Sequence, residues 1–136
     1  MSLFAKHKDT EFGIGDKIKV YQRIKEGEKE RVSIFDGMVL SISGRDTGTS
    51  FTVRKIGEAG IGIERIFPLY LPTIEKIEVI KKGTPGVRHA KLFYTREKSA
   101  REIESIYARA DRKNKVVEVT KKKPAKKKAK HARRKK

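Results

Sequence analysis

The sequence predicts a mainly β protein, with a small barrel, a C-terminal helix and a disordered basic tail. Three observations predict this class. Apolar and polar residues alternate between residues 16 and 82, which is the period of half-buried strands. Helical spacing replaces this alternation after residue 94. Residues 112–136 then carry 14 Lys or Arg against one acidic residue, which leaves too little apolar surface to order the chain.

The first strand of the predicted barrel places Ile18, Val20 and Ile24 on one face and lysines on the other. Residues 26–30, EGEKE, are typical of an exposed turn. Gly37 interrupts an otherwise continuous strand, which predicts a bulge or a sharp bend at a barrel corner. Further extended runs, separated by Gly, Asp, Thr or Pro, are RVSIF, GMVLSIS, SFTVRKI, GIERIF and IEKIEVI.

A helix is predicted at about residues 96–112. Ser99 and Glu102 match a capping box, although Thr95 could cap an earlier start. The residues at helical spacing are Ala100, Ile103, Tyr107 and Ala110. The predicted organisation is therefore an N-terminal extension at 1–11, the barrel with a basic segment at 12–94, the helix at 95–112 and a lysine-rich flexible tail at 113–136.

The net charge of +18 favours a polyanionic partner, because bound cations release the counterions of phosphate groups. Nucleic acid is the first candidate. No stretch approaches the roughly 18 apolar residues of a membrane span, and the N-terminus lacks the apolar core of a signal peptide. Together with the absence of cysteine, this predicts a cytoplasmic protein without membrane partners.

Motifs for catalysis or metal binding are weak. His7, His89 and His131 lie far apart and have no partners at metal-ligand spacing. The serines have no histidine near them in sequence, although residues that are distant in sequence can still meet in a fold. We therefore expect no enzyme, no metal and no cofactor.

The glycine-rich stretch GEAGIG, residues 57–62, raises the question of a phosphate-binding loop. A Walker loop needs Lys and then Ser or Thr after its last glycine, but Ile63 and Glu64 follow here. A dinucleotide fingerprint needs another glycine where Arg65 stands, and a helix where prolines follow. A hairpin is the better interpretation. A four-residue loop would place Arg54 opposite Ile63, and a five-residue loop would place it opposite Glu64; the sequence leaves both registers open.

Two groups of cations are candidates for contacts with nucleic-acid phosphates. The first lies on this hairpin and the loop before it, and comprises Arg45, Arg54, Lys55 and Arg65. The second spans residues 81–101, and comprises Lys81, Lys82, Arg88, Lys91, Arg96, Lys98 and Arg101. Phe93 and Tyr94 interrupt this second group. They could support RNA bases, but for Phe93 we favour a place in the core. For His89 we favour an ordinary surface imidazole.

The runs FDGMV, SFTVRKI, GIERIFPLYLPTIEKIEVIKKG and VRHAKLFYTRE closely resemble the bacterial-type large-ribosomal-subunit protein nineteen family over roughly residues 12–106. The resemblance implies an SH3-like barrel that binds large-subunit ribosomal RNA near the subunit interface. It also implies a contribution to an intersubunit bridge with small-subunit RNA, and neighbouring large-subunit proteins that include protein fourteen. The hairpin cations and the basic segment match the RNA-facing regions of that family.

Several features depart from the family pattern. The segment before Phe12 is short, TPG at 84–86 is inserted, Thr95 replaces the usual leucine, and the lysine-rich tail is additional. One alternative function is a free nucleic-acid-binding or nucleoid-condensing protein, because the PAKKKAK tail also suits compaction by charge. A second alternative is an enzyme with a nucleotide substrate.

Overall fold

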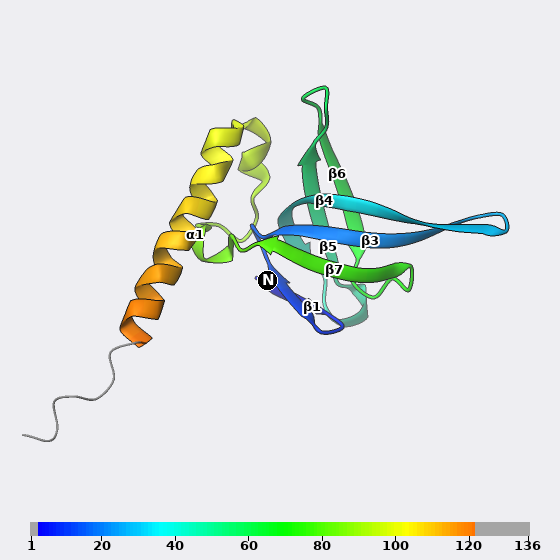
Figure 1. Ribbon diagram of the computed structural model, residues 1–136, viewed down its shortest axis with the longest axis horizontal. Coiled ribbons are helices and arrows are strands. Elements are labelled where there is room, and N and C mark those ends of the chain that lie inside the picture. The colour runs from blue at the N-terminus through cyan, green and yellow to red at the C-terminus, as the bar shows by residue number, and fades with distance from the viewer. Residues whose placement is uncertain (1–2, 122–136) are drawn as a thin grey trace, which may run out of the picture.

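The computed structural model describes residues 3–121. One five-stranded antiparallel sheet dominates, with a two-stranded hairpin beneath it and one α-helix at its side (Figure 1). The strands are β1 Phe4–His7, β2 Thr10–Gly13, β3 Lys17–Glu26, β4 Lys29–Ser43, β5 Ser50–Ile56, β6 Gly62–Pro68 and β7 Ile74–Lys81. The 3-10 turns are η1 Asp46–Gly48, η2 Thr84–Gly86 and η3 Phe93–Glu97, and the helix is α1 Ala100–Lys121.

The predicted mainly β class is confirmed, but the closed barrel is not found. The strand order is β6-β5-β4-β3-β7, and within the described chain the two edge strands do not pair with each other. The β1–β2 hairpin lies across this opening. His7 donates a hydrogen bond from Nδ1 to the Leu69 carbonyl beyond β6 (2.8 Å), and Lys8 Nζ donates to the Glu75 carbonyl in β7 (2.6 Å). The N-terminal extension is thus part of the folded unit, and its predicted boundary at residue 12 falls inside β2.

Four phenylalanine rings lie at the centre of the core. Phe51 contacts Phe12 edge-on at 5.0 Å between ring centroids, and it stacks on Phe67 at 5.5 Å. Phe35 adjoins Phe67 at 5.9 Å. Because β5 contributes Phe51 and β2 contributes Phe12, this packing fixes the N-terminal hairpin to the main sheet.

The long strand β4 changes partner near Gly37. Gly37 pairs with Ile18 of β3, whereas the next residue, Met38, pairs with both β3 and β5. A Cβ at Gly37 would overlap the backbone of Arg54, so glycine allows the close approach of β5. The irregularity itself lies between Val39 and Ser41. The sequence therefore identified this corner, but the bulge is displaced from the glycine.

The GEAGIG stretch is the loop of the β5–β6 hairpin. Ile56 pairs with Gly62, which leaves a five-residue loop, and Arg54 lies opposite Glu64. The second of the two registers is therefore correct. Gly60 has a φ of +74°, a conformation that L side chains rarely adopt. Gly62 meets a different requirement. A Cβ there would overlap the Arg54 guanidinium, so glycine leaves room for that side chain.

Asp16 is a buried carboxylate that joins two distant segments. It is 2% exposed and follows the β1–β2 hairpin. Its Oδ2 accepts a hydrogen bond from the Gly13 N–H at 2.9 Å. Its Oδ1 accepts from the N–H groups of Gly83 and Thr84 and from the Thr84 hydroxyl, at 2.7, 2.9 and 2.7 Å. The start of the basic segment is thereby held to the N-terminal hairpin.

Residues 84–86, TPG, form η2, and α1 packs against this turn. A Cβ on Gly86 would overlap the Ile106 carbonyl, so the helix backbone lies directly against this turn. Arg109 also donates from Nε to the Gly86 carbonyl at 3.1 Å. On the helix side the contact is made by Ile106 and Ala110, both buried. These contacts between η2 and α1 help to fix the position of the helix.

The helix starts and ends later than the sequence predicted. Glu102 accepts the Ser99 N–H at 3.0 Å, the capping-box contact at the helix start. Residues 93–97, predicted in part as helix, form η3 instead. At the other end α1 continues to Lys121, although residues 111–117 are exposed (Figure 1). The predicted tail thus begins inside the helix, and residues 122–136 lie outside the described residues.

Glu64 connects the β5–β6 hairpin to η3. Its Oε1 accepts from Arg54 Nη1 at 2.9 Å, and Arg96 donates to both of its oxygens at 2.8 Å. The hydrogen bond from Arg96 and then that from Arg54 lower the pKa of Glu64, and partial burial opposes them. This carboxylate neutralises two cations that the sequence had assigned to RNA.

Asp16→Ala should destabilise the protein strongly, because three backbone N–H groups would lose their acceptor. We expect the free energy of unfolding to fall by about 3 kcal/mol, measured by urea denaturation with circular dichroism. Asp16→Asn, which keeps one carbonyl acceptor, should lose less. Asp111→Ala, at an exposed helical position, is the matched control. An Asp16→Ala protein as stable as this control would contradict the role of Asp16.

The Glu64 ion pairs should make stability depend on pH. The pKa of Glu64 is lower in the folded state than in the unfolded chain, so its contribution is complete above the unfolded value of about 4.3 and is lost as the pH falls through the folded pKa. We therefore expect the stability difference between the wild type and Glu64→Gln to shrink from pH 7 to pH 3. Urea titrations at both values measure it, and a constant difference would refute the assignment.

Candidate nucleic-acid interface

The structure separates the eleven predicted cations by their surroundings. Five are exposed and form no ion pair within residues 3–121: Arg45, Lys82, Arg88, Lys91 and Arg101. The other six are engaged with the protein itself: Arg54, Lys55, Arg65, Lys81, Arg96 and Lys98. Carboxylates hold Arg54, Arg96 and Lys98, whose charge is thereby offset, and aromatic rings contact the other three. We call the first five the open cations and take them as the stronger candidates.

Four of the open cations come from the 81–101 segment. Lys82, Arg88 and Lys91 lie between β7 and η3, and Arg101 lies in the first turn of α1. This connection is largely irregular, yet backbone hydrogen bonds hold it in place. Leu92 donates its N–H to the Leu40 carbonyl at 2.9 Å, and its side chain is fully buried. The cations therefore extend from a fixed backbone.

The predicted hairpin cluster is divided between two faces of the sheet. Arg54 faces Glu64 and η3, whereas Lys55 and Arg65 face the opposite side, as alternation along strands requires. Lys55 Nζ lies 4.9 Å from the centroid of the Phe35 ring, and the Arg65 guanidinium lies 5.2 Å from it. The three cations therefore do not form one surface, because the sequence cluster ignored this alternation.

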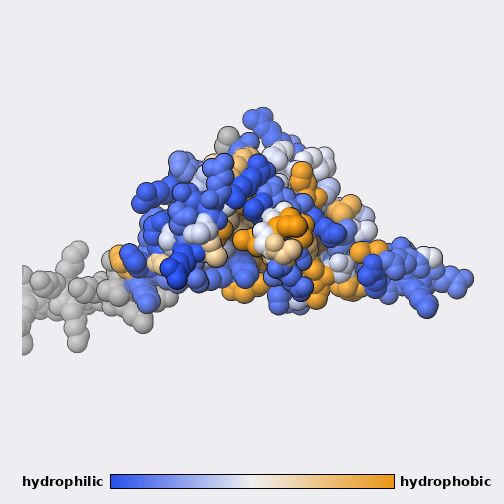
Figure 2. Space-filling view, turned by 90° about the horizontal axis from the view of Figure 1, so that it is seen from above, coloured by the Kyte–Doolittle hydropathy of each residue, from blue (hydrophilic) through white to orange (hydrophobic). Residues whose placement is uncertain are grey.

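The tip of this hairpin carries no Lys or Arg between residues 57 and 64. Its exposed side chains include Ile56, Ile61 and Ile63, which are 52%, 66% and 40% exposed. Seen from the end of the molecule to which this hairpin points, the surface is mainly hydrophilic, with hydrophobic side chains near the centre (Figure 2). The tip is therefore better suited to an apolar neighbour than to phosphates.

Phe93 and Tyr94 are 38% and 39% exposed, so the expectation that Phe93 belongs to the core is wrong. The Arg96 guanidinium lies 4.6 Å from the centroid of the Phe93 ring. Tyr94 adjoins His89 edge-on at 5.7 Å between ring centroids. Leu92 alone of the three neighbouring apolar residues at 92–94 is buried. The basic segment thus exposes aromatic rings beside its cations, a composition suited to unpaired bases.

The start of α1 forms a second polar surface. Lys98 pairs with Glu102 at 3.2 Å, and hydrogen bonds from the Ser99 N–H and then from Lys98 lower the pKa of Glu102. Thr95 is buried and donates its hydroxyl to the Leu92 carbonyl at 2.6 Å. The hydrogen-bonding need of this buried hydroxyl is therefore met locally. Lys81 also contacts the protein itself, since its Nζ lies 4.8 Å from the centroid of the Tyr107 ring.

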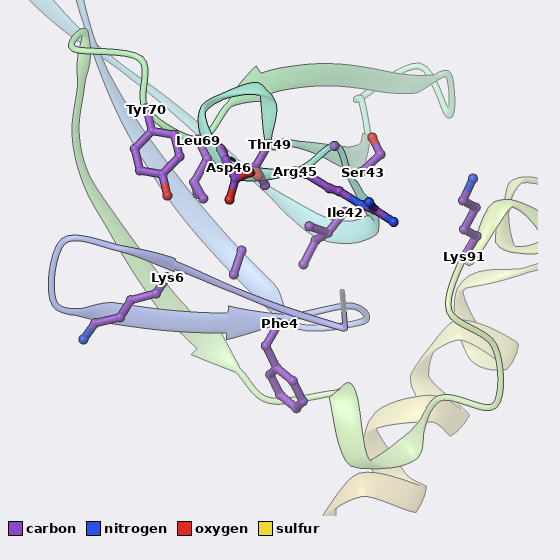
Figure 3. Close-up of a pocket in the computed structure, with 12 residues that line it drawn as sticks. Phe4, Lys6, Ile42, Ser43, Arg45, Asp46, Thr49, Leu69, Tyr70 and Lys91 are labelled. Atoms are coloured by element: carbon purple, nitrogen blue, oxygen red, sulfur yellow. Dashed lines mark hydrogen bonds between the residues drawn. The ribbon is translucent and has the colours of Figure 1, made fainter. Parts of the chain in front are cut away.

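Arg45 and Lys91 come from separate parts of the chain and line the same open groove (Figure 3). Sequence reasoning missed three further residues of this groove, Phe4, Lys6 and Tyr70. They lie in the short N-terminal segment and between two prolines, where no strand or helix pattern drew attention to them. The tyrosine between two prolines in the run PLYLP was the one available signal.

Other kinds of site find no support in the described part of the chain. Within it, no three His, Asp or Glu side chains gather as a metal site would require. No helix among residues 3–121 combines the length and the apolar character that crossing a bilayer demands. The clustered cations and exposed aromatic rings remain the most distinctive chemical feature of the surface.

Comparison with known proteins agrees with the resemblance seen in the sequence. The family model described as "Ribosomal protein L19" matches residues 2–109. The large ribosomal subunit protein bL19 of Thermosipho africanus is 59% identical over 87 residues, which cover 64% of this chain and 74% of that protein. The bL19 of Thermosipho melanesiensis is 57% identical over 86 residues, covering 63% of this chain and 73% of that protein. The bL19 of Sulfurovum sp. is 56% identical over 87 residues, covering 64% and 71%. The chain belongs to the ribosomal protein L19 family.

Proposed function

We propose that this protein is a structural constituent of the large ribosomal subunit and acts in the cytoplasmic ribosome by binding ribosomal RNA. The observation that carries the proposal is the set of open cations, four of which extend from the 81–101 segment beside exposed aromatic rings. Membership of the L19 family supports it, and the relatives compared above are named as large-subunit proteins. No catalytic step is part of this function.

The binding energy would come mainly from phosphate contacts. Each cation that neutralises a phosphate releases condensed counterions, so the affinity falls steeply as salt rises. The fixed backbone of the 81–101 segment reduces the entropy lost when these side chains are ordered on RNA. The cations held by Glu64 and by the ring of Phe35 would contribute less, because their charge or surface is already engaged.

The finer parts of the proposal concern the place of the protein in the ribosome. We place it near the subunit interface, in a bridge to small-subunit RNA and beside protein fourteen, with an SH3-like barrel completed by the β1–β2 hairpin. The family resemblance is the support for this placement. The apolar tip at Ile56, Ile61 and Ile63 offers a surface for a neighbouring protein. The lysine-rich tail would add phosphate contacts on assembly.

Removing open cations should weaken RNA binding and its dependence on salt. For Lys82→Gln, Arg88→Gln and Arg101→Gln combined, we expect the slope of log affinity against log salt to decrease by about 2 to 3. Filter binding to large-subunit RNA at several salt concentrations measures this. The matched control replaces Lys25, Lys29 and Arg31, on the β3–β4 ribbon, where Lys25 and Arg31 pair with Glu30 and Glu26. Equal slopes in the two triple variants would count against the assigned surface.

A free nucleic-acid-condensing protein remains the second candidate because of the PAKKKAK tail, and truncation separates the two functions. A chain ending at Lys121 keeps the whole of α1. For a ribosomal protein we expect this chain to sediment with the large subunit in high-salt gradients of cell lysate. If the truncated chain stays at the top of the gradient while the full chain binds bulk DNA, the condensing function is the correct one.

A further inference from the structure

The groove shared by Arg45 and Lys91 has a volume of about 790 Å³ and is open to solvent. Its walls come from β1, from the loop after β4 and from the residues that follow β6 (Figure 3). Ala5, Ile42 and Leu69 are buried and provide an apolar floor. The groove is therefore large enough for a nucleobase with its sugar and phosphate, and it has an apolar surface against which a base can lie.

The charged groups divide the groove into two ends. Arg45 points toward the end where Lys91 lies, although 46 residues separate them in sequence (Figure 3). Tyr70 lies at the opposite end, and Asp46 lies between Tyr70 and Arg45. A phosphate is attracted by the two cations and repelled by the Asp46 carboxylate, so it would occupy the Arg45 and Lys91 end. The Lys6 side chain points away from that end.

Two exposed aromatic rings border this groove. Tyr70 is 62% exposed and Phe4 is 50% exposed, which is a large apolar surface to leave in water. A groove with an aromatic ring at one end and cations at the other can bind an unstacked base and its phosphate together. Paired bases in a duplex are already stacked, so they would leave both rings uncovered.

The loop with Arg45 and Asp46 is already folded for binding. Gly44 has a φ of +89°, and a Cβ there would overlap the Gly48 carbonyl. Asp46 also has a positive φ, of 48°, which is uncommon for a residue other than glycine. Its carbonyl accepts from the Thr49 hydroxyl at 2.8 Å, and the Gly48 N–H donates to the Arg45 carbonyl at 3.0 Å. The conformation that presents the two charged side chains is thus fixed by the loop itself.

We propose that this groove holds a single unpaired nucleotide of the bound RNA. Its phosphate contacts Arg45 and Lys91, its base lies against Tyr70, and an exocyclic amino group of the base donates to the Asp46 carboxylate. Carboxylates accept from such amino groups, as that of cytosine, whereas uracil has none to offer. The inference rests on the proposed RNA-binding function and adds a defined site and a base preference to it.

Crosslinking in assembled subunits tests the site. The full-length chain carries a photoreactive benzophenone side chain in place of Tyr70 and is incorporated into large subunits. After irradiation, the crosslinked position in the RNA is mapped by reverse transcription. We expect one unpaired nucleotide. Crosslinks to paired nucleotides alone, to a protein alone, or to nothing would overturn the inference. The same group at Tyr21, on the outer face of β3 beside Glu78, is the matched control and should not crosslink that nucleotide.

Co-sedimentation of the same preparation keeps this test separate from the proposed function. If the Tyr70 derivative travels with the large subunit but its crosslinks lie elsewhere, the ribosomal function stands and the nucleotide site is wrong. If neither derivative is incorporated while the unmodified chain also stays unbound, the proposed function fails, and the inference fails with it.

The base preference is tested with Asp46→Gly. Glycine adopts the positive φ at this position without strain, so the variant removes the carboxylate and keeps the loop. We expect the full-length protein to bind short oligocytidine roughly tenfold more tightly than oligouridine, and Asp46→Gly to bind the two alike. Filter binding at one salt concentration measures both ratios. Equal ratios in the wild type and the variant would refute the contact, and free CMP that binds as tightly as oligocytidine would refute RNA as the source of the nucleotide.

Discussion

The fold depends on a single buried carboxylate. Asp16 accepts four hydrogen bonds from Gly13, Gly83 and Thr84, and no residue of the described chain forms an ion pair with it. A buried carboxylate needs hydrogen-bond donors, and buried backbone N–H groups need an acceptor, so the two kinds of group stabilise each other. Since Asp16 and Gly83 lie 67 residues apart, these contacts bring the N-terminal hairpin against the segment that leads into η2 and α1. The position of the basic segment follows from them.

The cations that remain available on the surface depend on ion pairs within the protein as well as on composition. Glu64 binds Arg54 and Arg96, and Glu102 binds Lys98, so part of the positive charge of the body is balanced within the protein. Among the eleven predicted cations, the five open ones lie on the 81–101 segment and in the loop after β4. Cations gathered in one region bind a polyanion in fewer orientations than cations that are evenly distributed.

Much of the fold could be predicted because the signal was local. The alternation of apolar and polar residues around Ile18 and Val20 indicates that one face of the strand is buried. Every extended run predicted from the sequence lies within an observed strand. The predicted barrel closure is not found, and the open sheet could not be foreseen because its gap is covered by the β1–β2 hairpin, whose four-residue strands are too short for a clear period. The helix end was missed for a related reason. Apolar spacing stops at Ala110, where burial stops, while residues able to remain helical continue to Lys121.

The candidate site was predicted by residue type, and the internal partners of its cations could not be predicted from the sequence. The predicted cations include Arg96, whose partner Glu64 is 32 residues away and becomes a neighbour through tertiary packing. The groove beside Arg45 is a stronger example, since its residues come from β1, from the loop after β4, and from the segments after β6 and η2. Each of these segments alone resembles an ordinary exposed turn. The hydrogen bond from Leu92 to Leu40 holds the segment with Lys91 against β4, so a contact that stabilises the fold also brings Lys91 to the groove.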